Sequence, residues 1–188
     1  MNLLLNSEIS MLTVDENIQL TPLNAPMAES LCELVNDNRA YLSHWLPWVP
    51  NSQKAEHFLA FINQTIAERE EQKSLVLGIF WQQQLVGVCG FNKIDWQLGV
   101  ADLGYWLAAD MQGKGIMTKS CHWLINYAFE ELKINKVQLS AAVENKASRQ
   151  VAKRLGMTLE GVLRRREKVG DKVLDHAVYG LLREEWKL

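Results

Sequence analysis

The 188-residue chain has only three cysteines, and they form no metal-binding or redox motif. Cys32, Cys89 and Cys121 lie far apart in the sequence, and no C-x-x-C pair occurs. The four histidines show no H-E-x-x-H or other ligand spacing, so we expect no metal site. An odd number of isolated cysteines is typical of a protein that is kept reduced, which favours a cytoplasmic location.

The chain also lacks an excess of charge of either sign and any long hydrophobic run. It has 20 Lys and Arg residues against 22 Asp and Glu residues, a formal net charge of −2. Dedicated nucleic-acid-binding proteins usually have a strong basic excess, so we expect no direct nucleic-acid binding. The apolar run at residues 3–5 is too short to cross a bilayer and follows no basic segment. Neither a membrane span nor a signal peptide is therefore predicted.

No internal repeat, low-complexity tract or linker rich in Pro, Gly or Ser divides the chain. Its length suits one domain, and its hydrophobic residues, 48% of the chain, are enough for a packed core. We expect one domain over residues 1–188.

Hydrophobic periodicity predicts alternating strands and helices. Strands are expected at residues 11–22, 74–81, 85–94, 100–108 and 136–143, and in a final hairpin that turns at Gly170-Asp171. Helices are expected at residues 26–35, at 53–71, along the apolar stripe from Cys121 to Leu132, and at 146–155, before Gly156. The aromatic, proline-rich segment at residues 41–52 cannot form a regular helix.

The order of these elements predicts the fold class. The strands at residues 74–81, 85–94 and 100–108 follow one another through short turns, as in an antiparallel meander. A helix separates the strand at 100–108 from the strand at 136–143, which requires a parallel crossover. The sequence therefore predicts an α+β fold with a mixed, mostly antiparallel sheet.

Gly113 and Gly115 lie between a predicted strand and a predicted helix. The first turn of a helix leaves N–H groups without partners, and these groups and the helix dipole favour an anion, commonly a phosphate. The spacing matches neither an NTPase loop nor a dinucleotide-binding fold. From the glycines alone, a strand–helix turn that binds nothing is an equal alternative.

The longer segment YWLAADMQGKGIMTKS resembles the pyrophosphate-binding segment of the GNAT superfamily of acyl-CoA N-acyltransferases. That family's pattern, Q/R-x-x-G-x-G/A, falls on Gln112, Gly115 and Met117. Met117 departs from the small residue that usually occupies the last place. The order of predicted elements also matches the superfamily fold, a twisted sheet flanked by helices.

Two further segments are similar to one branch of that superfamily, the ribosomal-protein N-acetyltransferases RimJ and RimL. They are NRAYLSHWLPW at residues 38–48 and ENKASRQVAKRLGMTLEG at residues 144–161. Within the branch, the resemblance to RimL is the stronger. Together, the three segments extend the resemblance over nearly the whole chain.

The resemblance implies acetyl-CoA as acetyl donor and a primary amine that attacks the thioester directly in a ternary complex. The branch implies that this amine is the N-terminal α-amino group of a ribosomal protein, and that the enzyme is a homodimer. Two alternatives stay open. One is that the acceptor is a polyamine or an aminoglycoside. The other is that the chain is a CoA-binding module without catalysis.

The resemblance also places residues around the two substrates. Those around acetyl-CoA are Trp106, Leu107, Gln112, Gly113, Lys114, Gly115, Ile116, Met117, Thr118 and Asn145. Backbone N–H groups at Trp106 and Leu107 are expected to bind the thioester oxygen as its negative charge grows. The acceptor site is expected to include Tyr41, His44, Trp45 and Trp48, with core packing as the alternative for the two tryptophans.

One catalytic residue is implied to give a proton to the leaving thiolate. Most of the superfamily has a tyrosine for this seven residues after the motif asparagine, but that place is Ala152 here. RimL-like enzymes use a serine three residues after Asn145, which is Ser148. The alternative for Ser148 is an ordinary place in the first turn of a helix capped by Asn145.

The second implied catalytic residue is Glu167, in the segment RRREKV. It is expected to accept the proton of the acceptor ammonium through a water. Regular strand alternation puts Glu167 on the same face as Arg165 and Val169. The structural alternative is a surface ion pair with the neighbouring arginines.

Overall fold

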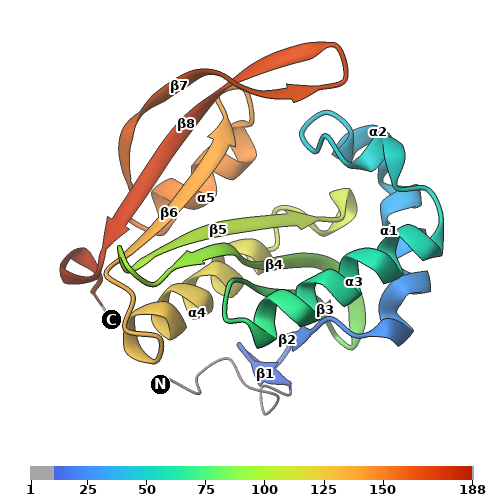
Figure 1. Cartoon of the computed structure of the whole chain (residues 1–188), viewed down its shortest axis with the longest axis horizontal. Coiled ribbons are helices and arrows are strands. Elements are labelled where there is room, and N and C mark those ends of the chain that lie inside the picture. Colours follow the sequence, from blue (N-terminus) through green and yellow to red (C-terminus); the bar gives the residue numbers. More distant parts are fainter. Residues whose placement is uncertain (1–10, 188) are drawn as a thin grey trace.

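The sheet contains one parallel pair among antiparallel strands (Figure 1). The computed structural model describes residues 11–187, so the apolar run at residues 3–5 lies outside it. Within the described residues the strand order is β1-β2-β3-β4-β5-β6-β8-β7. The strands are β1 (Leu12–Thr13), β2 (Ile18–Pro22), β3 (Leu75–Trp81), β4 (Gln84–Asp95), β5 (Val100–Leu107), β6 (Lys136–Ala142), β7 (Thr158–Val169) and β8 (Lys172–Leu182). Only β5 and β6 are parallel, which confirms the predicted mixed sheet.

Helices cover both faces of this sheet. They are α1 (Ala28–Asp37), α2 (Arg39–Leu42), α3 (Ala55–Glu70), α4 (Ile116–Glu130) and α5 (Lys146–Arg154). The larger core cluster joins the sheet to α4 and α5, and the smaller one joins it to α1 and α3. Alternation along β3 explains the two clusters, because Leu75 and Leu77 enter the larger core and Val76 contacts the smaller one.

β5 and β6 are paired over only part of their length. The parallel register runs from Val100 opposite Lys136 to Leu103 opposite Leu139. Beyond it, β6 stays paired with β8, while β5 continues beside β4 alone. Figure 1 shows the two strands diverging. The β6-facing backbone groups of residues 104–107 therefore have no strand partner within the described chain.

β7 contains a bulge opposite β8. Leu163 pairs with His176 and Glu167 with Leu174, so four residue steps on β7 face two steps on β8. Within the bulge, Arg165 has a φ of 52° and donates its backbone N–H to Asp175 Oδ1 at 2.7 Å. The regular alternation predicted for this part of β7 is wrong, because the bulge inserts residues between the predicted neighbours.

Other element boundaries differ from the prediction for local reasons. The strand expected at residues 11–22 is interrupted between β1 and β2, where Asp15 Oδ1 accepts the N–H groups of Asn17 and Ile18. The first helix is preceded by a 3-10 turn that contains Pro26. The segment at residues 41–52 forms only the end of α2 and a 3-10 turn, as its prolines predict. The hairpin turn at Gly170-Asp171 is confirmed.

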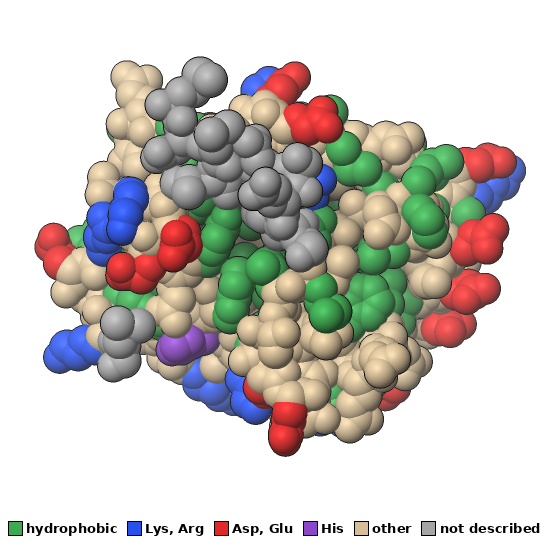
Figure 2. All heavy atoms as spheres, turned by 90° about the horizontal axis from the view of Figure 1, so that it is seen from below, with side chains coloured by type: hydrophobic (Ala, Val, Ile, Leu, Met, Phe, Trp, Pro, Cys, Tyr) green, Lys and Arg blue, Asp and Glu red, His purple; other side chains and the backbone are tan. Residues whose placement is uncertain are grey.

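The surface shows no face made of one charge in the view from below (Figure 2). Acidic and basic side chains are scattered along the edges of this face, with hydrophobic side chains between them. Among residues 11–187, no helix is both long and apolar enough to cross a membrane.

Candidate active site

A first cavity, of about 770 Å³, is formed by the end of β5, the glycine segment and the first turns of α4 and α5. It contains most of the residues that the sequence predicts around acetyl-CoA. Those lining it are Trp106, Leu107, Gln112, Gly113, Gly115, Ile116, Met117, Thr118 and Asn145. Lys114 does not line it, and its Nζ lies 3.2 Å from Met111 Sδ. We call this space the donor cavity.

The glycine segment presents a helix N-terminus to the donor cavity. Gly115 is the N-cap of α4 with a φ of 77°, and no described side chain caps the helix. The first helical bond joins Lys119 N to Gly115 O at 3.0 Å, so the N–H groups of residues 116–118 have no helical partner. A Cβ at Gly115 would meet nothing within 4 Å. Glycine is therefore required by the backbone conformation, and the free N–H groups suit a pyrophosphate.

Met117, the bulky residue at the end of the motif, packs into the larger core. Its side chain is 7% exposed. The core takes up its bulk, so the side chain does not prevent the first turn of α4 from lining the cavity.

Three cationic side chains also line the donor cavity. They are Lys119, Lys146 and Arg154. Lys119 Nζ lies 2.6 Å from Asp15 Oδ2, and this hydrogen bond lowers the pKa of Asp15. Lys146 and Arg154 stand at the two ends of α5. These positive charges suit an anionic ligand.

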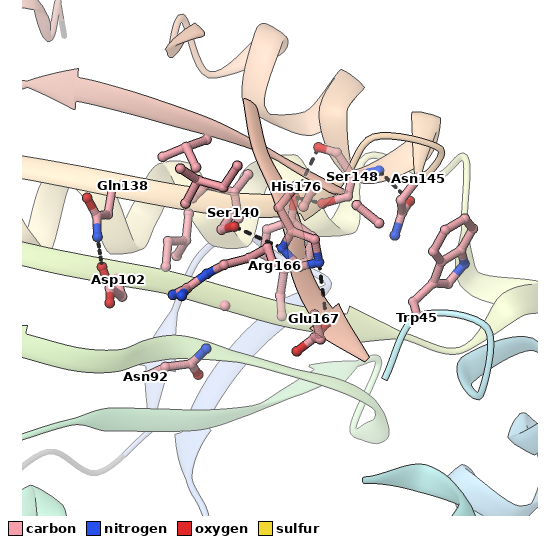
Figure 3. A pocket seen from close by; sticks show the side chains of 18 of the residues that line it. Trp45, Asn92, Asp102, Gln138, Ser140, Asn145, Ser148, Arg166, Glu167 and His176 are labelled. Carbon is pink, nitrogen blue, oxygen red and sulfur yellow. Dashed lines mark hydrogen bonds and ion pairs between the residues drawn. The ribbon is translucent and has the colours of Figure 1, made fainter. Parts of the chain in front are cut away.

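A second cavity, of about 660 Å³, lies between β5, β6 and the β7–β8 hairpin (Figure 3). We call it the acceptor cavity. The polar residues that line this cavity and not the donor cavity are Asn92, Asp102, Gln138, Ser140, Arg166, Glu167 and His176. It shares Trp45, Leu46, Tyr105, Asn145 and Ser148 with the donor cavity. The two cavities therefore meet beside the unpaired end of β5.

Ser148 lies at this junction, in the first turn of α5. Its backbone N–H donates to Asn145 Oδ1 at 3.1 Å, so the predicted helix cap is present. Its Oγ lies 3.0 Å from Tyr105 Oη, and Tyr105 Oη also donates to Ser148 O at 3.2 Å. Burial raises the pKa of Tyr105, so its hydroxyl stays protonated and available as a donor. The cap uses the backbone N–H of Ser148, and the hydroxyl is instead hydrogen bonded to Tyr105 at the junction.

Glu167 follows the β7 bulge and lines only the acceptor cavity. Its Oε2 lies 3.4 Å from Nε2 of His176, a β8 residue. The described residues contain no arginine paired with Glu167, so the alternative of an arginine ion pair is not formed among them. Asp102, on β5 across the cavity, accepts a hydrogen bond from Gln138 on β6.

The predicted acceptor-site aromatics occupy different places. Trp45 lines both cavities, and Tyr41 lines the donor cavity, where it is hydrogen bonded to Gln112. Trp48 packs its ring against Trp106, with centroids 6.4 Å apart, as part of the smaller core. His44 is exposed and lines neither cavity. A direct contact of these side chains with the acceptor stays a prediction.

Residues 17–158 match the family of the acetyltransferase (GNAT) domain. The chain belongs to the GNAT acetyltransferase family. YdaF of Bacillus subtilis (strain 168) is 34% identical to this GNAT chain, over 93% of the chain and 96% of YdaF.

Two solved GNAT-like acetyltransferases have nearly the same fold. RimL, a ribosomal L7/L12 alpha-N-protein acetyltransferase in complex with coenzyme A, gives a TM-score of 0.90 at 27% identity, covering 94% of this chain and 99% of RimL. MccE, the microcin C7 self-immunity acetyltransferase in complex with acetyl-CoA and AMP, gives a TM-score of 0.88 at 29% identity, covering 96% of this chain and 99% of MccE. The GNAT chain is thus an N-acetyltransferase whose acetyl donor is acetyl-CoA. Among its described residues, no cluster of His, Cys, Asp or Glu could hold a metal ion.

Sequence reasoning missed two residues that the fold brings to the predicted catalytic pair. Tyr105 is 43 residues from Ser148, and His176 lies on the strand after Glu167. His176 belongs to no motif. Tyr105 is the first residue of the segment YWLAADMQGKGIMTKS, but it does not occupy a position of the family pattern. Its place at the start of that segment was the available clue.

We predict that Gly115→Val weakens acetyl-CoA binding by about tenfold or more, since valine disfavours the φ that presents the first-turn N–H groups of α4. Gly156→Val is the matched control, because Gly156 has a φ of 75°, open space for a Cβ and no place in either cavity. Both variants should lose stability, by about 1–2 kcal/mol each for the left-handed backbone. Calorimetric titration with acetyl-CoA and a thermal melt separate the two effects. Equal acetyl-CoA affinity in both folded variants contradicts the phosphate assignment.

Proposed function

We propose that the enzyme acetylates the N-terminal α-amino group of a ribosomal protein. The observation that carries the proposal is the acceptor cavity, which is open, contains Glu167 and meets the donor cavity at Ser148. An extended protein N-terminus entering this cavity would bring its first amine to the junction. The likeness to RimL, named for a ribosomal L7/L12 substrate, supports the choice of acceptor. A single domain, a cytoplasmic location and a homodimer stay predictions.

The charges of the acceptor cavity favour an α-amine over a polyamine. A polyamine site needs a ring of carboxylates. Here Asp102 is already bonded to Gln138, and Arg166 adds a positive charge. The acidic segment at residues 68–72 lines neither cavity.

The acid–base properties of the acceptor point the same way. At pH 7.4 about a fifth of α-amino groups with a pKa of about 8 are neutral, against about a thousandth of lysine-like amines with a pKa of about 10.4. A site with one carboxylate as base therefore suits the α-amine.

In the proposed reaction, the acceptor nitrogen forms a bond to the acetyl carbon as the carbon–sulfur bond breaks. Glu167 takes the ammonium proton through a water before this attack. Backbone N–H groups at the unpaired end of β5, around Trp106 and Leu107, stabilise the charge that grows on the thioester oxygen. Ser148 gives its proton to the departing thiolate, and the second proton, which the acceptor nitrogen loses as the amide forms, replaces it on Ser148 Oγ. The contact with Tyr105 Oη holds this hydroxyl at the junction.

The acceptor assignment is tested by incubating the enzyme with labelled acetyl-CoA and purified ribosomal proteins. We expect one acetylated N-terminal α-amine, located by mass spectrometry, and no label on a protein whose N-terminus is blocked. Spermidine and an aminoglycoside are offered in parallel. Faster label transfer to either small amine, with none to the ribosomal proteins, overturns the proposal.

Ser148→Ala should lower kcat by roughly 10²-fold, because the departing thiolate loses its proton donor. The backbone N–H of Ser148 still reaches Asn145 in this variant, so the α5 cap and acetyl-CoA affinity should be little changed. The measurement is kcat beside the acetyl-CoA dissociation constant and the melting temperature. If kcat is unaltered while chemistry is rate-limiting, Ser148 has only a structural role in α5.

Glu167→Gln should cost about 10²-fold or more in turnover, since its shape is kept but its basicity is lost. The loss should shrink as pH rises, because more of the acceptor amine is then already neutral. Acetyl-CoA binding should survive, as Glu167 lines only the acceptor cavity. Values of kcat/KM from pH 6 to 9.5 test this, alongside a melt of each protein. Parallel pH profiles with a lowered melting temperature indicate a structural carboxylate instead.

A further inference from the structure

A buried histidine stands behind the Glu167 carboxylate. His176 is 8% exposed, on the strand between β6 and β7. Its Nδ1 lies 2.9 Å from Ser140 Oγ on β6, and its Nε2 lies 3.4 Å from Glu167 Oε2 on β7. Figure 3 shows the imidazole between the two, with the other carboxylate oxygen pointing away from the ring. All three side chains line the acceptor cavity.

The Nε2 atom of His176 is buried without a hydrogen-bond partner among the described residues. At 3.4 Å, Glu167 Oε2 is close enough for an ion pair and too far for a good hydrogen bond. A buried polar atom without a partner is uncommon and needs an explanation. Catalytic hydrogen bonds are often long without substrate and shorten in the reacting complex. Such shortening would explain why Nε2 has no partner in the described part of the chain.

The two neighbours of the imidazole are compatible with the tautomer that this explanation needs. A charged carboxylate only accepts, so Glu167 favours a proton on Nε2 of a neutral imidazole, and the Ser140 hydroxyl then donates to Nδ1. A donor at Oε2 then stabilises the charged carboxylate and holds its orientation. The second carboxylate oxygen is left for the acceptor amine or its bridging water.

The other charged groups around Glu167 are held elsewhere or face solvent. Asp102 on β5 is bonded to Gln138, and Asp175 on β8 accepts the backbone N–H of Arg165. Arg166, the neighbour on β7, lines the cavity but is exposed. Exposed charges are screened by water, so the imidazole is the fixed partner of the carboxylate.

We propose that His176, fixed by Ser140, is a positioning residue that orients the Glu167 carboxylate and keeps it charged for proton acceptance. The inference rests on the proposed role of Glu167 as base. It assigns a function to two side chains, on β6 and β8, that no motif marks.

Two substitutions at His176 distinguish a donor from a space-filling side chain. His176→Leu removes the N–H and should lower kcat/KM for the acceptor about tenfold or more at neutral pH. It should also move the acidic limb of the pH profile to higher pH, because the carboxylate loses a donor that favours its charged form. His176→Gln keeps an N–H and should retain most activity. The KM for acetyl-CoA should not change in either, and His122→Leu, an exposed site on α4, should match the parent enzyme.

Ser140→Ala tests the proposal if His176→Leu does not fold. This variant leaves the imidazole in place but removes the hydroxyl that helps to fix which ring nitrogen carries the proton. The acidic limb of its pH profile should therefore move to higher pH, by a smaller amount than in His176→Leu. An unmoved limb in folded Ser140→Ala and His176→Leu overturns the inference.

Combining His176→Leu with Glu167→Gln separates this inference from the proposed base. If His176 acts through Glu167, the double variant is no slower than Glu167→Gln alone. If the losses of activity of the two single variants multiply in the double variant, His176 acts by another route and the inference is overturned. Slow turnover of Glu167→Gln alone still supports Glu167 as the base. An unimpaired Glu167→Gln overturns the base itself.

Discussion

The partial pairing of β5 with β6 is the constraint on which the site depends. Where the parallel register ends after Leu103 and Leu139, backbone groups of β5 lose their strand partners and two cavities approach each other. β5 stays paired with β4, and β6 with β8, so each strand keeps one paired edge along the opening. Unpaired backbone groups cost free energy, and in the proposed mechanism a hydrogen bond to the thioester oxygen would offset part of that cost.

Tyr105, at the junction, and Glu167, in the acceptor cavity, differ in their burial. Tyr105 is buried, and burial raises its pKa, so its hydroxyl remains a donor behind Ser148. Glu167 is only half-buried and faces the acceptor side. In the proposed mechanism the two proton transfers would therefore use groups on different elements, Ser148 on α5 and Glu167 on β7.

Much of this arrangement follows from local sequence, and the remainder does not. The meander, the crossover and the Gly170-Asp171 turn are predictable because each depends on a short pattern of apolar residues and turn residues. The glycine segment and Ser148 are found through motifs. The contacts of His176 and Tyr105 are not, because their partners lie on other elements. His176 meets Ser140 and Glu167 through sheet pairing, and Tyr105 meets Ser148 only where the first turn of α5 lies against β5. The β7 bulge escapes prediction for a related reason. It is fixed by Asp175 on the facing strand, which binds the N–H of Arg165.

The same bulge protects the molecule against unwanted association. β7 is the last strand of the sheet, and its outer edge includes the exposed side chains of Leu159 and Val162. A long, straight edge of this kind is a template for strand addition by a second chain and for aggregation. The left-handed residue at Arg165, within a run of three arginines, interrupts that edge and places repelling charge on it. An irregularity that brings Glu167 to the cavity therefore also helps to keep the sheet from extending between molecules.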